Sequence, residues 1–284
     1  MKFQINVNSK TILADTITPV SVYMKFRDVF QNTILLESSD YHGIKGSWSF
    51  VCANPIATFS LQKNKIIETF PNGTKSVTHE GSEFNVVHRL NMFRQTFECQ
   101  KDNVPFNGIF GYITYDAIEH FETIKLHSPV DEERYIPDVF YSFYKYIIAI
   151  DHFHNQLIII ENLIQGEKSG IEQIITLLQS RNYAIYPFKA GKDEKSNKTD
   201  EEYMKMVTWG KESCMRGDVF QIVLSRRYSQ SFSGDDFNVY RTLRSVNPSP
   251  YLFYFDYGSF KLFGSSPEAQ LEIKNGKAAI HPIA

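Results

Sequence analysis

Residues 138–162, DVFYSFYKYIIAIDHFHNQLIIIEN, decide the fold class. Two runs rich in aromatic and β-branched residues flank the polar segment HFHN at 152–155, which is the pattern of two antiparallel strands joined by a turn. The aromatic side chains of the first run fit a packed strand better than a ligand-binding site. The two histidines of the turn, His152 and His154, are expected to be solvated.

Short strands and two helices are predicted before this hairpin. Thr18 followed by Pro19 is a helix start, so a helix is predicted over 19–31. The apolar period of 84–97 predicts a second helix. Short β-prone runs separated by Gly, Asn and Pro indicate an antiparallel meander, and they are 33–37, 47–53, 57–62 and 65–70.

A change in composition follows the hairpin. Residues 169–180 have apolar positions at helical spacing and predict an amphipathic helix. The run AGKDEKSNKT at 190–199 contains no large apolar residue and indicates a solvated linker. We therefore expect an amino-terminal domain over 1–189, a linker over 190–200 and a second domain over 201–284.

The second domain is predicted to begin with a helix. Thr199 and Glu202 have the spacing of a capping box, and the apolar stripe behind them stops at Gly217. Residues 218–232 then alternate apolar and polar side chains, which predicts a strand that holds Gln221 on one face.

The remaining sequence predicts a short helix over 236–246 and two hairpins. The first turns about Tyr257-Gly258, and the second has Asn275-Gly276, a pair that suits a type I′ turn. Together these elements predict an α+β fold with antiparallel β-sheets packed against outer helices.

Composition excludes several classes of function. Hydrophobic residues form 42% of the 284 residues, which is enough for a core and argues against disorder. A net charge of −2 gives no basic surface for nucleic acid or an anionic membrane. There is no signal peptide or long apolar run, so a cytoplasmic protein is expected. The three cysteines have no paired spacing, which argues against a disulfide framework and a zinc site.

Six segments carry a resemblance to a known family. From the amino terminus they are ILLES at 34–38, GIFGYITYDAIEHFE at 108–122, GDVFQIVLSRR at 217–227, NPSPYLFY at 247–254, FGSSPE at 263–268 and HPIA at 281–284. In this order the segments resemble component I of anthranilate synthase, the large chorismate-binding subunit, and the match covers the whole chain. Each segment alone is weak, and the shared order gives the resemblance its weight.

The resemblance implies a reaction in which ammonia adds to the chorismate ring, the ring hydroxyl leaves and pyruvate is eliminated to give anthranilate. A glutamine amidotransferase partner would supply the ammonia, and Mg²⁺ would hold the dianionic substrate. In the family most of the chorismate-binding domain follows the HPIA motif. The resemblance thus implies a chorismate-utilising fold that is incomplete at the carboxyl end, with the Mg²⁺ ligands beyond residue 284 and the chain inactive by itself.

Three residues bear on catalysis through the resemblance. Glu268 would be an active-site acid or orienting group, because a leaving hydroxyl needs a proton; the alternative is a solvated glutamate. Gln221 stands where water-adding relatives have a lysine base, and its amide suits ammonia as the nucleophile; the alternative is an exposed strand glutamine. Ala284, assigned to substrate binding, stands where aminodeoxychorismate synthase has a lysine nucleophile.

The resemblance also implies a tryptophan feedback site. Glu37 would pair with the ammonium of tryptophan, Ser38 would hydrogen-bond the ligand, and Pro250-Tyr251-Leu252 would cover the indole. The partner of the ligand carboxylate stays open between Ser47 and Lys45. The alternative for Glu37 and Ser38 is a strand end that turns into a loop.

The same residues bear on other possible functions. Aminodeoxychorismate synthase component I is disfavoured by Ala284, and isochorismate or salicylate synthases are disfavoured by Gln221. A non-catalytic tryptophan-binding fragment would keep the feedback residues without turning over chorismate. The carboxylates and histidine of DAIEH at 116–120 are interpreted as part of a structural strand-to-helix segment rather than a metal site.

Overall fold

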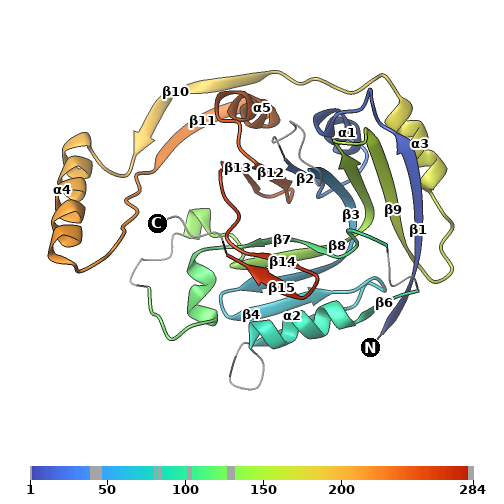
Figure 1. The fold of residues 1–284 in the computed structure, drawn as a ribbon, viewed down its shortest axis with the longest axis horizontal. Coiled ribbons are helices and arrows are strands. Elements are labelled where there is room, and N and C mark those ends of the chain that lie inside the picture. Colours follow the sequence, from blue (N-terminus) through green and yellow to red (C-terminus); the bar gives the residue numbers. More distant parts are fainter. Residues whose placement is uncertain are drawn as a thin grey trace. The chain divides into compact units, whose positions relative to one another are not determined.

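The computed structural model describes residues 2–38, 47–79, 81, 85–100, 104–126 and 132–280, and Figure 1 shows its ribbon. The chain separates into two compact units, Met1–Ala184 with Leu243–Ala284 and Ile185–Thr242.

An eleven-stranded sheet organises the first unit. Its strands are β1 (Phe3–Leu13), β2 (Ile34–Glu37), β3 (Trp48–Gln62), β4 (Lys65–Thr69), β5 (Lys75–His79), β6 (Phe97–Cys99), β7 (Ile109–Ile113), β8 (Val139–Asp151), β9 (Gln156–Ile164), β12 (Tyr251–Asp256) and β13 (Lys261–Ser266). The main path runs β13-β12-β2-β3-β8-β9-β1-β6, while β4 and β5 extend from β3 and β7 pairs with β8. Among the described pairs only β1 with β6 is parallel, so the predicted α+β class with antiparallel sheets is confirmed.

The hairpin predicted at 138–162 lies near the middle of this sheet. Strands β8 and β9 pair antiparallel from Tyr146 with Glu161 to Asp151 with Gln156. Asn155 has a positive φ of 53° in the turn between them, a conformation that asparagine tolerates. Ile147 and Ile160, which are partners in this register, are both fully buried in one cluster.

Strand β3 is longer than the sequence predicted. The runs 47–53 and 57–62 were expected to be separate strands, but they form one strand with a register shift between Pro55 and Ala57. Pro55 lies opposite Tyr144 and Ala57 opposite Phe143, so Ile56 is the extra residue of a bulge. Prolines within sheets are commonly found beside such irregularities, because proline has no amide proton for the ladder. The first half of β3 pairs with β2 and the second half with β4, and both halves pair with β8.

Three helices pack on this sheet, and they are α1 (Pro19–Phe26), α2 (Val86–Gln95) and α3 (Ile171–Gln179). The predicted cap of α1 is present, because Thr18 accepts a hydrogen bond from the Ser21 amide. The helix ends at Phe26 rather than near residue 31. The Phe30 amide still bonds to the Phe26 carbonyl, so the chain makes one more turn without extending the helix.

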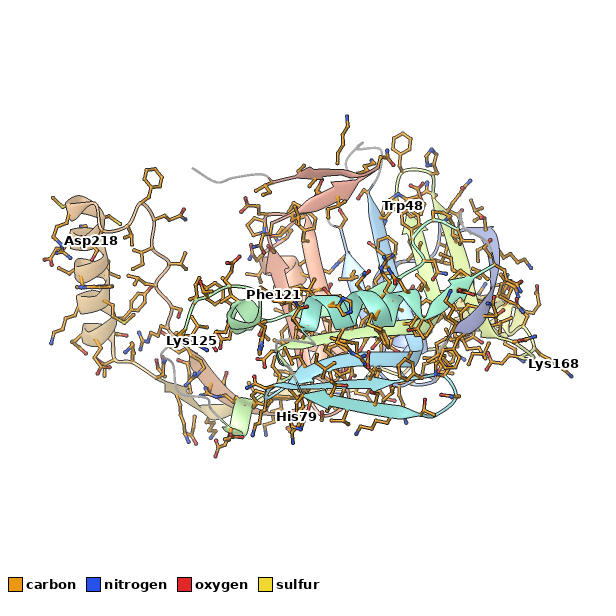
Figure 2. The ribbon with its side chains drawn as sticks, turned by 90° about the horizontal axis from the view of Figure 1, so that it is seen from below. Trp48, His79, Phe121, Lys125, Lys168 and Asp218 are labelled. Carbon is orange, nitrogen blue, oxygen red and sulfur yellow. The ribbon has the colours of Figure 1, made fainter. Side chains whose placement is uncertain are left out.

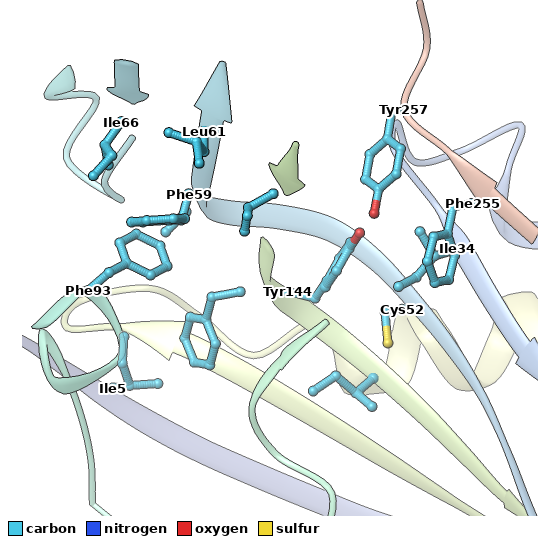
Figure 3. Close-up of a cluster of buried hydrophobic side chains, with 14 of the residues drawn as sticks. Ile5, Ile34, Cys52, Phe59, Leu61, Ile66, Phe93, Tyr144, Phe255 and Tyr257 are labelled. Atoms are coloured by element: carbon cyan, nitrogen blue, oxygen red, sulfur yellow. The ribbon is translucent and has the colours of Figure 1, made fainter. Parts of the chain in front are cut away.

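Aromatic side chains fill both faces of the sheet. On one face Phe59 of β3 and Phe93 of α2 have ring centroids 5.7 Å apart, and both are buried. The same cluster contains Tyr144 and Tyr257, whose hydroxyls point toward one another (Figure 3). Tyr23 of α1 meets Tyr254 of β12 edge to face at 5.2 Å.

The second unit contains β10 (Phe188–Ser196), α4 (Asp200–Arg216), β11 (Tyr228–Gly234) and most of α5 (Phe237–Val246), which was predicted over 236–246. The predicted capping box of α4 is present, and Gly217 ends the helix with a φ of 79°. Part of the stretch expected as a linker, 190–200, lies in β10, which pairs with β11. Backbone pairing does not require apolar side chains, so composition alone could not reveal this strand.

The strand predicted over 218–232 is wrong for most of its length. Residues 219–227 have no regular structure, and β11 begins only at Tyr228. Alternation fits a strand that has a neighbour, whereas no strand pairs with 219–227 in the part of the chain that the structure describes. The last hairpin, β14 (Glu272–Lys274) with β15 (Lys277–Ala279), turns at Asn275 and Gly276 with positive φ at both, as a type I′ turn requires.

Candidate functional site

The pairing of β2 with β12 brings together two segments that are distant in the sequence. Leu252 lies opposite Glu37, and Phe255 lies opposite Ile34. The register therefore places the LLES strand beside the Pro250-Tyr251-Leu252 segment. These are the residues to which the resemblance assigns the feedback site.

Glu37 forms an ion pair with Arg244. The Glu37 side chain is 0% exposed, and Arg244 Nε donates to its Oε1 over 3.2 Å. Arg244 lies in the last turn of α5 and is itself 33% exposed. A buried carboxylate needs such a cation, because desolvating an ionised group without compensation is costly. No pattern in the sequence pairs these two residues.

Ser38 is held by a chain of hydroxyl groups. Its amide donates to Ser49 Oγ over 3.2 Å, and Ser47 Oγ donates to Ser38 Oγ over 3.1 Å. Ser49 is fully buried on β3 and its Oγ lies 2.6 Å from Nε2 of His152. We call Glu37, Ser38, Ser49, His152 and Arg244 the β2-end cluster. It lies at the end of β3 that begins with Trp48, which Figure 2 labels.

The two histidines of the β8–β9 turn differ from one another. His154 has a side chain that is 53% exposed and pairs with Asp151, Nδ1 to Oδ2, at 2.7 Å. His152 is half-buried against Ser49, so the expectation that both are solvated is wrong for His152. Burial lowers the pKa of His152; the Asp151 carboxylate raises it, and the charge of Arg244 lowers it further. Spacing in a turn cannot separate two histidines when only one has a partner on another strand.

The lowered pKa of His152 predicts a loss of stability in acid. In the unfolded chain His152 binds a proton near pH 6.5, and in the folded chain it does so only at lower pH. The contribution of the neutral His152 ring to the free energy of unfolding is therefore complete above pH 6.5. It is lost as the pH falls from there through the folded pKa. We expect the free energy of unfolding, from urea titrations across this range, to fall less in His152→Gln than in the unsubstituted protein or in His154→Gln. An identical pH dependence in all three would contradict this.

The segment assigned to the indole divides into buried and accessible parts. Leu252 is buried, whereas the ring of Tyr251 is partly exposed. The Tyr251 hydroxyl donates to Glu272 Oε1 over 3.2 Å. Pro250 is half-buried at the start of this strand. Tyr251 and Pro250 are thus the members of the segment that a ligand can reach from solvent.

The residues assigned to catalysis lie in different parts of the chain. Glu268 follows β13 in the first unit and is half-buried, and its carbonyl accepts from Ser266 Oγ over 3.2 Å. Gln221 belongs to the second unit, where it is exposed and is not on the strand expected for it. Ala284 and Lys45 lie outside the described residues.

A metal site is not formed by the described residues, among which no three His, Cys, Asp or Glu side chains are arranged to hold an ion. In the strand-to-helix segment, Glu119 accepts from the Leu126 amide, and His120 Nε2 lies 4.0 Å from Asp138 Oδ2. These contacts tie the segment to its surroundings. None of the described helices has the length and apolar character needed to cross a bilayer.

Comparisons with known proteins extend over nearly the whole chain. Residues 31–284 match the family described as chorismate binding enzyme. Anthranilate synthase component 1 of Aquifex aeolicus is 29% identical, over 96% of this chain and 57% of the relative. The protein of the same name from Saccharomyces cerevisiae is 32% identical, over 94% of this chain and 56% of the relative. The chain therefore spans a little over half the length of these relatives.

Solved structures share the fold. Anthranilate synthase component I from Streptococcus pneumoniae superimposes with a TM-score of 0.60 at 23% identity, covering 95% of this chain and 60% of that one. A menaquinone-specific isochorismate synthase from Escherichia coli gives a TM-score of 0.56 at 11% identity, with coverage of 95% and 52%. The expected chorismate-utilising fold is therefore confirmed.

Proposed function

The chain belongs to the family of chorismate binding enzymes, and we propose that it serves in the large subunit of an anthranilate synthase. The proposed reaction converts chorismate and ammonia to anthranilate and pyruvate in tryptophan biosynthesis. A glutamine amidotransferase subunit is the proposed partner that supplies ammonia, and the cytoplasm is the proposed location. The chain covers the part of such a subunit in which the proposed feedback site lies.

One observation carries this proposal, namely the pairing of β2 with β12. The register sets Glu37 beside Leu252, so the two segments that the resemblance assigns to tryptophan binding are neighbours in one sheet. An α-amino acid carries an ammonium and a carboxylate, and the β2-end cluster offers the carboxylate of Glu37 and the guanidinium of Arg244. The Ser38 hydroxyl accepts from Ser47, which leaves its own proton for a ligand oxygen.

The catalytic roles follow from the chemistry of the proposed reaction. Glu268 would protonate or orient the leaving hydroxyl, because a poor leaving group needs an acid. The amide of Gln221 is not a base and would not deprotonate water to hydroxide. Ammonia would therefore be the nucleophile that attacks chorismate. Ala284 would line the substrate site with a methyl group that cannot attack chorismate. Mg²⁺ is the proposed cation of the whole enzyme. The described residues do not fit a magnesium site, so none of them is proposed to hold the ion.

Tryptophan binding tests the proposal. We expect purified protein to bind L-tryptophan in isothermal titration, and Glu37→Gln to weaken binding by about tenfold to a hundredfold. A hydrogen bond to a charged group contributes about 1.5–3 kcal/mol, and each 1.4 kcal/mol is about tenfold in affinity.

The matched control is Glu172→Gln. Glu172 lies on α3, is well exposed and pairs only at the surface with Lys10, so this substitution should leave the affinity unchanged. Circular dichroism melts of both variants would show that each is folded. If tryptophan failed to bind, or bound Glu37→Gln as tightly as the unsubstituted protein, the proposed site would be wrong.

A further inference from the structure

The β2-end cluster contains a hydrogen-bonded chain that the feedback site does not by itself require. It runs from the Ser38 amide to Ser49 Oγ over 3.2 Å and from Ser49 Oγ to His152 Nε2 over 2.6 Å. Ser49 is fully buried, so its hydroxyl is not in contact with solvent. The three residues come from three segments of the sheet: the end of β2, β3 and the β8–β9 turn.

The chemistry of the serine hydroxyl sets the direction of this chain. A hydroxyl has one proton to donate, and its oxygen can accept through two lone pairs. When Nε2 of His152 carries no proton, the Ser49 hydroxyl donates to that nitrogen. A lone pair of the Ser49 oxygen then accepts from the Ser38 amide. The ring on the β8–β9 turn thereby orients the hydroxyl that fixes the backbone of Ser38.

We propose that His152 is a positioning residue of the tryptophan site, acting through Ser49 to fix the Ser38 backbone where the ligand binds. This inference rests on the proposed function, because it deepens the account of that same site. His152 itself need not touch the ligand. Its effect is to preorganise Ser38, so that less of the binding free energy is spent on ordering the strand end.

Protonation of His152 reverses the hydrogen bond. A charged ring donates from Nε2, and the buried Ser49 proton then loses Nε2 as its acceptor. The charged groups that face the ring are Arg244 from α5, which is paired with Glu37 of β2, and Asp151 from its own turn. Arg244 opposes a second positive charge, and burial lowers the pKa of His152 in the same sense. Tryptophan affinity is therefore expected to fall in acid.

Two substitutions of His152 separate positioning from simple packing. His152→Gln keeps an uncharged polar end for Ser49, and we expect affinity within about threefold of the unsubstituted protein at about pH 8. His152→Phe fills the space without any acceptor and should weaken tryptophan binding by about tenfold, since one buried hydrogen bond of about 1 kcal/mol and its unsatisfied donor are involved. Between about pH 8 and about pH 5 the affinity should fall in the unsubstituted protein and stay level in His152→Gln.

The neighbouring histidine provides the control. His154→Gln, two positions along the same turn, should keep both the affinity and its pH dependence, because His154 contacts Asp151 and not Ser49. Ser49→Ala removes the hydroxyl that links the Ser38 amide to His152 and so interrupts the hydrogen-bonded chain. It should weaken tryptophan binding by about as much as His152→Phe. This second variant decides the matter even if His152→Phe does not fold.

The outcomes distinguish this inference from the proposed function. If the unsubstituted protein binds tryptophan and both Ser49→Ala and His152→Phe bind it equally well, the positioning role is overturned and the site stands. If the unsubstituted protein does not bind tryptophan at any pH, the site and the inference fall together. A ligand-free readout is the NMR signal of the Ser38 amide, which should titrate in acid in the unsubstituted protein and not in His152→Gln. An amide that titrates equally in both would also overturn the inference.

Discussion

Phe59→Ala is expected to lower the free energy of unfolding by about 3–5 kcal/mol. Phe59 is fully buried on β3, and its ring packs against Phe93 of α2 at 5.7 Å. Alanine would remove the apolar surface of the ring and leave a cavity in the buried cluster that Phe59 shares with Phe93. The helix α2 would lose its main aromatic neighbour on β3.

Urea unfolding followed by circular dichroism would measure this effect. Phe153→Ala is the matched control, because Phe153 lies in the β8–β9 turn with 45% of its surface exposed. We expect this control to change stability by less than about 1 kcal/mol. A Phe59 variant as stable as the control would mean that α2 does not pack on β3 as described.

Arg244→Ala is expected to cost about 3 kcal/mol of stability. The substitution leaves the buried Glu37 carboxylate without the cation that contacts it at 3.2 Å. Breaking a buried pair from one side typically costs about 3–5 kcal/mol. We expect the lower end of this range, because Arg244 is one-third exposed and water can enter the space that it leaves.

A double substitution separates the ion pair from the surrounding packing. Replacing both partners, as in Glu37→Leu with Arg244→Leu, should recover most of the lost stability, since apolar side chains then replace both members of the ion pair. Arg241→Ala is the control on the same helix, because Arg241 is exposed and bonds only Asn238 within one turn. If Arg244→Ala were no more destabilising than Arg241→Ala, the ion pair would not be a structural link between β2 and α5.

Local patterns predicted most of the elements of the fold. The hairpin at 138–162 has both periodicity and turn residues, and the caps at Thr18 and Thr199 have side chains of the right kind at the right spacing. Such signals lie within a few residues of one another, so the sequence displays them directly. The continuity of β3 through Pro55 was not predictable, because a bulge depends on the partner strands that bracket it.

The missed predictions depend on neighbours that are far away in the sequence. Residues 219–227 alternate like a strand, yet the structure gives them no pairing. Conversely, the polar run within 188–196 is a strand because β11 pairs with it. In both places the hydrogen-bonding partner, rather than the side-chain pattern, determines the conformation.

The candidate site was only partly accessible from sequence. The resemblance identifies its two segments, because it rests on short motifs in a shared order rather than on local periodicity. Arg244 and Glu37 are 207 positions apart, and no pattern in either segment identifies the pair. The contact that distinguishes His152 from His154 is not visible in the sequence, because its partner, Ser49, lies 103 positions away on another strand.

The position of β2 between β3 and β12 has a consequence for synthesis of the chain. Glu37 of β2 and Leu252 of β12 face one another. Residue 252 comes 215 positions after residue 37 in the sequence. At about 5–20 residues per second, the ribosome needs roughly 10–40 s to deliver the second after the first. During that interval the edge of β2 that β12 will cover has no partner from β12, so it is open to pairing with another chain until β12 has been made.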